Sequence, residues 1–213
     1  MALVRLRATT DPPKVRGPAR LVPLLVYGTA AAIAIGVALA RGESPIETNA
    51  WGVTLPFGLG HIASLVGGVV LALGTTAATK QFVRRWTWAR LLHLNLRPAV
   101  RDANGTTIAI LAIGSALGEE LFFRGLCAPV FGLVLSSLAF GLLHQAQGRA
   151  RWVWAAWATV MGLLFGALYL GTGSLLGPIV AHAAINVVNL RFLRDTEIEP
   201  PKQRRLGGLL GRA

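Results

Sequence analysis

The sequence has little of what keeps a soluble domain in water. Only 14% of its 213 residues are charged, whereas 54% are hydrophobic, and the polar residues gather in short runs between long apolar ones. It also has a single cysteine, Cys127, which excludes a disulfide framework or a thiolate metal site within this chain. In its apolar context that cysteine is typical of a small buried hydrophobe. These shortages exclude an ordinary soluble protein and indicate one domain that crosses a membrane several times.

Acidic residues are also scarce, because nine Asp and Glu stand against 21 Lys and Arg, which gives a formal charge of +12. Such a charge suggests nucleic-acid binding in a soluble domain, but this chain has no basic, aromatic-rich soluble segment to carry it. The basic residues lie beside the apolar runs, where they attract anionic lipid headgroups and set the topology. We therefore expect the lipid bilayer as a partner, and no nucleic acid.

Apolar runs of about 20 residues, enough for a helix to cross a bilayer, predict an all-α polytopic transmembrane helical bundle. About six spans are expected, with a short fourth, at residues 21–40, 57–78, 106–126, 130–145, 152–170 and 174–190. The chain then divides into a basic N-terminal segment, two spans with a basic connection, a four-span core and a basic tail, at 1–20, 21–105, 106–190 and 191–213. The first apolar run is longer than a secretory signal core, which favours an uncleaved anchor.

The distribution of Lys and Arg predicts the orientation. If there are six spans and both termini are cytoplasmic, the N-terminus, the connection 80–101, the loop around Arg149 and the tail share one side, and only Arg41 lies in an outer loop. We therefore expect an integral protein of a bacterial-type plasma membrane. The connection 80–101 carries Trp86 and Trp88. It is either an amphipathic segment on the membrane surface or a solvated basic loop.

Two adjacent carboxylates, Glu119 and Glu120, stand inside an apolar span and are followed by Arg124. A carboxylate in hydrocarbon is costly unless it is paired, hydrogen-bonded or hydrated, so an intramembrane carboxylate suggests a functional site. On a helix Glu120 and Arg124 share a face and can pair, whereas Glu119 points about 100° away from Glu120. We interpret Glu120 and Arg124 as a supporting pair, and Glu119 as a general base that takes a proton from water.

Two later spans add further polar groups. His144 lies near the end of the fourth span, and His182 and Asn186 share one face of the sixth. Imidazole can bind a metal, orient water or donate to an oxyanion, and a carboxamide is a neutral donor suited to the last role. If these groups converge with Glu119, they form a site that activates water to hydrolyse an amide.

Each polar residue alone has a simpler interpretation. A single intramembrane histidine is more often an interhelical hydrogen-bonding group, which is our interpretation of His61 in the second span, and Asn189 is typical of a packing residue. Glu120 and Arg124 can form a structural clasp even in an enzyme. Three spans that each carry an ionisable group without a function are much rarer than one such span, because each group raises the free-energy cost of inserting its helix into the membrane. The set as a whole therefore favours a functional site.

Three motifs follow one another in successive apolar segments, namely Glu-Glu-x-x-x-Arg from Glu119, Phe-x-x-x-His from Phe140 and His-x-x-x-Asn from His182. In this order they resemble the CAAX prenyl protease and bacteriocin-processing family of intramembrane endopeptidases, also called type II CAAX proteases or the Abi family. The resemblance covers about residues 106–190. It implies an all-helical intramembrane fold, with fewer spans here than in larger relatives, and an endopeptidase that acts on a peptide or protein substrate at the membrane.

The resemblance also implies roles for individual residues. Glu119 resembles the water-activating carboxylate of the family, His144 and His182 its paired histidines, and Asn186 its amide on the oxyanion side, while Glu120 and Arg124 match its supporting pair.

Metal dependence stays open at this point. The sequence has no His-Glu-x-x-His helix, which would give zinc two imidazoles from one turn. Glu119, His144 and His182 could still ligate a divalent metal such as zinc from separate helices. A metal-free glutamate base is the alternative.

Two other functions compete with the protease. One is a non-catalytic membrane adaptor or immunity protein of the same fold, against which the retention of all three motifs argues. The other is a small transporter or proton relay. A relay predicts further carboxylates along a path through the membrane, and the expected spans contain only Glu119 and Glu120.

Straight helices leave a conflict in depth. At a rise of 1.5 Å per residue, Glu119 and His182 lie about 10 Å from the outer ends of their spans, whereas His144 lies about 20 Å from the outer end of the fourth. Convergence therefore requires a tilt, a kink near Pro129 or a different break between the third and fourth spans. The sequence leaves undecided on which side of the membrane the site opens.

Overall fold

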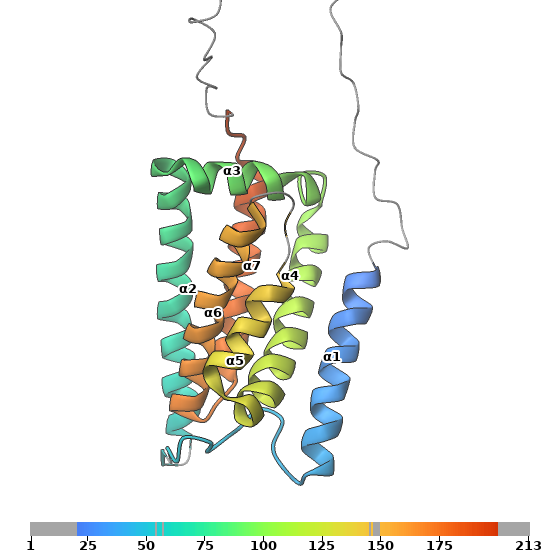
Figure 1. Cartoon of the computed structure of the whole chain (residues 1–213), viewed down its shortest axis with the longest axis vertical. Helices are drawn as coiled ribbons and strands as arrows, with labels where there is room; N and C mark the ends of the chain where they lie inside the picture. Colours follow the sequence, from blue (N-terminus) through green and yellow to red (C-terminus); the bar gives the residue numbers. More distant parts are fainter. Residues whose placement is uncertain (1–20, 54, 57, 145, 147–149, 200–213) are drawn as a thin grey trace, which may run out of the picture.

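Helices make up most of the described chain, which confirms the predicted all-α class (Figure 1). The computed structural model describes residues 21–53, 55, 56, 58–144, 146 and 150–199. Its α-helices are α1 (Leu21–Ala40), α2 (Leu59–Arg85), α3 (Thr87–Leu96), α4 (Gly105–Glu119), α5 (Ala128–Leu143), α6 (Ala150–Thr172) and α7 (Leu176–Asp195). A 3-10 turn, η2 (Arg97–Ala99), follows α3, and a π-helical segment, η3 (Glu120–Cys127), joins α4 to α5. The expected N-terminal segment, the end of the basic tail and Arg149 lie outside the described residues.

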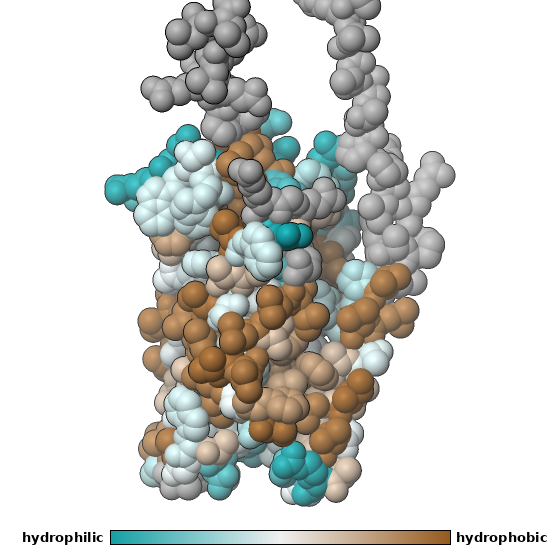
Figure 2. All heavy atoms as spheres, viewed as in Figure 1, coloured by the Kyte–Doolittle hydropathy of each residue, from teal (hydrophilic) through white to brown (hydrophobic). Residues whose placement is uncertain are grey.

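Five helical stretches in the described part are long and apolar enough to cross a membrane, namely Val22–Ala40, Leu59–Arg85, Gly105–Leu143, Ala150–Thr172 and Leu176–Asp195. Figure 2 shows hydrophobic side chains in a band around the middle of the bundle, with hydrophilic ones toward its two ends. A bilayer exposes a protein to hydrocarbon over the middle and to headgroups and water at the ends. The chain is therefore a polytopic membrane protein, as predicted.

The stretch Gly105–Leu143 supplies two of the expected spans, because the chain reverses near Gly132. This residue has φ 82 and ψ 167, a backbone conformation that glycine adopts at little cost. The Arg124 guanidinium carbon lies 4.1 Å from the centroid of the Phe140 ring, whereas a straight helix would separate these two positions by about 24 Å. The break lies a few residues later than expected. Pro129 sits in the first turn of α5, where a missing N–H is tolerated.

Glycines let the helices approach closely, as is common for packing inside a membrane. Where α2 packs against α7, a Cβ atom on Gly68 would meet the backbone of Gly177. Where α1 packs against α4, a Cβ atom on Gly118 would lie 2.5 Å from the backbone oxygen of Tyr27. No side-chain rotation can relieve a clash with backbone, so both contacts require glycine.

Helix α3 lies across one end of the bundle, within the basic connection (Figure 1). Trp86 and Trp88 at its start are exposed, and the Trp86 ring stacks on Phe82 with 4.6 Å between centroids. On the inner face His93 is buried, and its Nε2–H donates to the backbone oxygen of Thr196 at 2.9 Å. Burial lowers the pKa of His93 from its ordinary value, because it disfavours the charged ring. The connection thus contains an amphipathic helix docked on the bundle.

The connection between α1 and α2 crosses the opposite end and is fixed to the turn between α6 and α7. The Thr48 N–H donates to the Gly173 oxygen at 3.0 Å, and the Leu175 N–H donates to the Ile46 oxygen at 2.9 Å. Both ends of the bundle are therefore covered by chain, and the polar residues of the spans lie between them.

Candidate active site

Three ionisable side chains from three helical segments meet at the end of α4. Glu119 is the last residue of α4, His144 follows the last residue of α5, and His182 lies in α7. The Nε2 atoms of both histidines lie 3.7 Å from Oε2 of Glu119. The structure thus brings together three of the four residues that the sequence selects for catalysis, while their roles stay predictions.

The late reversal near Gly132 resolves the conflict in depth. Gly132 lies 13 positions after Glu119 and 12 positions before His144, so the two arms of the hairpin have nearly equal length. His144 therefore returns to the depth of Glu119. It also leaves the helix, with φ −82 and ψ 85, at the point where α5 ends.

The second nitrogen of each histidine is held by an acceptor. The Nδ1–H of His144 donates to the Phe140 backbone oxygen at 2.8 Å, and the Nδ1–H of His182 donates to Oε1 of Glu120 at 2.7 Å. Since these acceptors require the proton on Nδ1, Nε2 of each neutral ring carries a lone pair. Both lone pairs face Glu119.

Glu120 and Arg124 form a buried ion pair beneath this group. The Glu120 side chain is 0% exposed, and its Oε1 accepts from Nη1 of Arg124 at 3.0 Å. The guanidinium lies over the Phe140 ring at 4.1 Å and near the Phe165 ring at 5.3 Å, distances at which a cation is attracted to an aromatic face. Because the same Oε1 also accepts from His182, the pair orients one of the histidines.

Asn186 lies beside the group, one helical turn beyond His182. Its Nδ2 donates to the Ser115 hydroxyl oxygen at 3.1 Å, and Ser115 lies one turn before Glu119 in α4. This bond links α7 to α4 at the edge of the site. Sequence reasoning selected Asn186 but gave no signal for Ser115, because a serine in a span is common in helix packing.

Sequence reasoning also missed the aromatic walls and one polar contact. The Phe165 ring stacks on the His182 ring with 5.3 Å between centroids, and Trp154 lies 6.0 Å from the His144 ring. Tyr27 of α1 packs against Gly118, the residue before Glu119, and its hydroxyl lies near enough to the Glu119 carboxylate to interact with it. Aromatic residues in an apolar span face either lipid or protein, so their sequence positions alone did not separate these cases.

The site is least covered on the side of His144. The exposed fraction of the side chain is 22% for His144, 12% for Glu119 and 7% for His182. Oε2 of Glu119 is buried and has no hydrogen-bond partner within the described residues. That oxygen is therefore available to accept a hydrogen bond from a water molecule or a substrate.

Glu119, His144 and His182 are the three residues that could ligate a metal at this site. Zinc in proteins lies about 2.0–2.3 Å from each of its ligands, in a tight shell of four. Within the described residues, no group of three or more His, Cys, Asp or Glu side chains is arranged to hold a metal ion.

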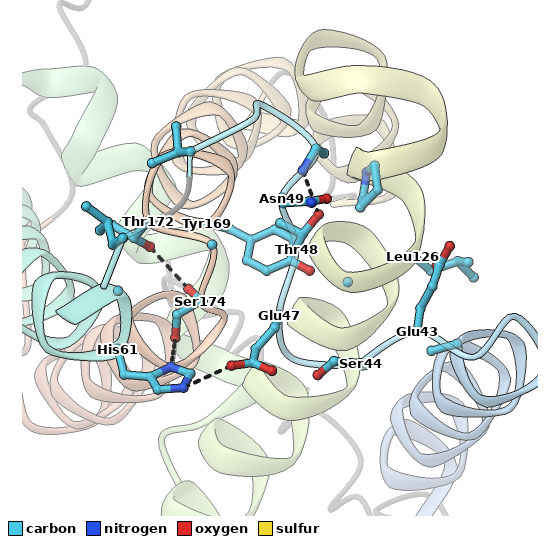
Figure 3. A pocket seen from close by; sticks show the side chains of 18 of the residues that line it. Glu43, Ser44, Glu47, Thr48, Asn49, His61, Leu126, Tyr169, Thr172 and Ser174 are labelled. Atoms are coloured by element: carbon cyan, nitrogen blue, oxygen red, sulfur yellow. Dashed lines mark hydrogen bonds and ion pairs between the residues drawn. The ribbon is translucent and has the colours of Figure 1, made fainter. Parts of the chain in front are cut away.

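A separate cavity, of about 700 Å³, lies at the end of the bundle that the α1–α2 connection covers (Figure 3). His61 stands at its wall, where Nδ1 lies 2.8 Å from the Ser174 hydroxyl and Nε2 lies 3.1 Å from Oε1 of Glu47. Ser174 is 1% exposed. These bonds tie α2 to the connection and to the α6–α7 turn, so His61 is a hydrogen-bonding group as interpreted, but its partners lie in connecting segments and not in another helix.

The part of the chain that holds the Glu119 site matches a known family. Residues 103–188 match the family described as Type II CAAX prenyl endopeptidase Rce1-like, which confirms the resemblance seen in the motifs. An uncharacterized protein of Bacillus subtilis (strain 168), YpbD, is 35% identical over 81 residues, which cover 38% of this chain and 42% of that relative. The match thus spans less than half the length of that relative. No solved structure matches the chain significantly.

Proposed function

Residues 103–188 belong to the type II CAAX prenyl endopeptidase family, and from this premise we propose that the protein is an intramembrane endopeptidase in which Glu119 activates water. One observation carries the proposal. Oε2 of Glu119, a buried oxygen, lies 3.7 Å from Nε2 of both His144 and His182. A general base needs such an acceptor close to groups that orient the attacking water.

In the proposed reaction, a water molecule donates one hydrogen bond to Oε2 of Glu119 and the other to an imidazole Nε2. Glu119 takes the first proton as the water oxygen attacks the peptide carbonyl carbon. The carbonyl oxygen becomes an oxyanion, and we assign its stabilisation to the Asn186 amide, a neutral donor. When the C–N bond breaks, Glu119 returns its proton to the leaving amine. The products are a carboxylic acid and an amine, and Glu119 is ionised again.

Glu120 and Arg124 support this reaction indirectly. Because Glu120 accepts from Nδ1 of His182, Nε2 of that ring is left without a proton and can accept from water. Arg124 balances the charge of Glu120 in a region from which solvent is excluded. We therefore propose that the pair positions His182 and takes no part in proton transfer.

Substrate trapping tests the proposed function. A Glu119→Gln protein retains the shape of the site but lacks the base, so it should co-purify from membranes with an intact peptide or protein that the unchanged enzyme releases as fragments. A second experiment removes metal ions with a chelator. We expect the unchanged enzyme still to cleave the trapped substrate after this treatment. Loss of cleavage on chelation, with recovery on zinc addition, would replace the metal-free mechanism by a metalloprotease.

The trapping experiment also separates the protease from its alternatives. A partner that binds the unchanged protein and the Glu119→Gln protein equally and is never cleaved would favour a membrane adaptor or immunity protein. Proton flux through liposomes that is lost in Glu119→Gln would favour a relay.

We further propose that the protein lies in the plasma membrane with both termini in the cytoplasm. Because the chain reverses near Gly132, it crosses the bundle an even number of times when α1 and α7 are both counted. Helix α3 and the basic residues around it then lie on the cytoplasmic side, and Arg41, next to the α1–α2 connection, lies outside.

Labelling of single cysteines tests this topology. In a Cys127→Ala background, Thr10→Cys and Arg205→Cys should be protected from a membrane-impermeant reagent added outside the cell, whereas Pro45→Cys should react. All three should react after the membrane is opened, which controls for buried thiols. Termini on different sides would mean that α5 is re-entrant and that the chain crosses an odd number of times.

A further inference from the structure

Helix α1 lies outside the segment that matches the family, yet it touches the site. It packs against α4 and η3. A Cβ atom on Gly114 would lie 3.0 Å from Leu24, and a Cβ atom on Gly118 would lie 2.5 Å from the backbone oxygen of Tyr27. The two glycines, one turn apart in α4, let α1 approach at the turn that ends in Glu119. Tyr27 therefore meets α4 directly beside Glu119.

Tyr27 therefore packs directly against Gly118, the residue before Glu119, and this places its hydroxyl near the Glu119 carboxylate. The other groups around that carboxylate do not hold it by hydrogen bonding. When Nδ1 carries the proton, Nε2 of His144 and of His182 is a hydrogen-bond acceptor. The Glu119 oxygen, 3.7 Å away, is also an acceptor, so neither histidine forms a hydrogen bond with it. A phenol hydroxyl is a donor, and carboxylates are acceptors. Tyr27 thus supplies the hydrogen-bond donor that the two histidines do not provide.

We propose that Tyr27 is a positioning residue of the active site, which donates a hydrogen bond to Glu119 and keeps Oε2 of the carboxylate directed at the two histidines. This inference rests on the proposed function. It makes α1 part of the enzyme, although the catalytic motifs begin some ninety positions later in the chain. A general base that turns away from the water loses most of its effect, because proton transfer requires hydrogen-bond distance.

The chain offers a matched control, because it has only two tyrosines. The second, Tyr169, is 1% exposed and lines the cavity under the α1–α2 connection (Figure 3). Tyr27→Phe and Tyr169→Phe each remove one hydroxyl and change nothing else. With a fluorogenic peptide whose cleavage requires Glu119, we expect Tyr27→Phe to lower kcat about 10- to 100-fold with KM nearly unchanged. Tyr169→Phe should lower thermal stability and leave kcat unchanged.

A second measurement detects the contact without any activity. In the Tyr169→Phe background, 3-fluorotyrosine labels Tyr27 alone, and its ¹⁹F resonance should shift when Glu119→Gln replaces the carboxylate by an amide. An unshifted resonance overturns the proposal, as does a shifted resonance with an unchanged kcat in Tyr27→Phe. If Glu119→Gln cleaves normally, the proposed protease mechanism fails, and the resonance still decides whether Tyr27 holds this carboxylate.

Discussion

Glu119→Gln should abolish peptide cleavage and leave the protein folded in the membrane at its normal level. Glutamine has nearly the shape of glutamate but cannot take a proton from water at neutral pH. General-base catalysis contributes about 10²–10⁴-fold to a rate, so the loss should be at least about 100-fold. Oε2 of Glu119 makes no hydrogen bond within the described residues, so the fold has little to lose. Cleavage of the trapped substrate and thermal unfolding in detergent measure the two effects.

The neighbouring carboxylate provides the contrast. Glu120→Gln should lower stability as well as activity, because Glu120 is fully buried and accepts from both Arg124 and His182. The change leaves the Arg124 cation without its counter-ion and weakens the group that fixes the His182 tautomer. Normal proteolysis by Glu119→Gln would end the assignment of Glu119 as the base.

The sequence alone predicted the pairing within one helix well, because spacing controls it. Glu120 and Arg124 are four apart, and they meet even though η3 is π-helical. The sequence did not show that Glu120 also contacts His182. The imidazole lies between both carboxylates, with Nδ1 at 2.7 Å from Glu120 and Nε2 at 3.7 Å from Glu119. Adjacent residues on a regular helix point about 100° apart, so spacing alone did not indicate that one imidazole would contact both.

Contacts between helices were not predictable in the same way. In lipid every face of a span is apolar, so hydrophobic periodicity does not mark which face meets another helix. Nothing in the sequence therefore indicated that Tyr27 would meet Glu119, or Ser115 would meet Asn186.

The backbone reversal was likewise hidden. The chain has 25 glycines, and composition does not tell which of them adopts a positive φ. Pro129 was the more obvious candidate for a break, but at the start of a helix proline is harmless. Because the reversal falls at Gly132 instead, His144 reaches the depth of Glu119 without any tilt being required.

The buried ion pair leads to the second large effect. Arg124→Leu should lower the free energy of unfolding by about 3–5 kcal/mol, because it leaves a fully buried carboxylate without its cation. The double variant Glu120→Leu/Arg124→Leu should recover much of that loss, since replacing a whole buried pair by apolar residues is often neutral. Its activity should stay low, however, because His182 then lacks its Nδ1 acceptor. Stability and activity would thus respond separately to the same pair.

Arg41→Gln is the matched control for this cycle, because it breaks the exposed pair between Arg41 and Glu43, whose side chains are about half exposed. Exposed pairs contribute about 0–1 kcal/mol, so its unfolding free energy should barely change. Unfolding in mixed micelles measures the unchanged protein, Glu120→Leu, Arg124→Leu, their double variant and Arg41→Gln. Strictly additive losses for Glu120→Leu and Arg124→Leu would show that the two side chains are not coupled. In that case the pair could not hold His182 in the way that the proposed reaction requires.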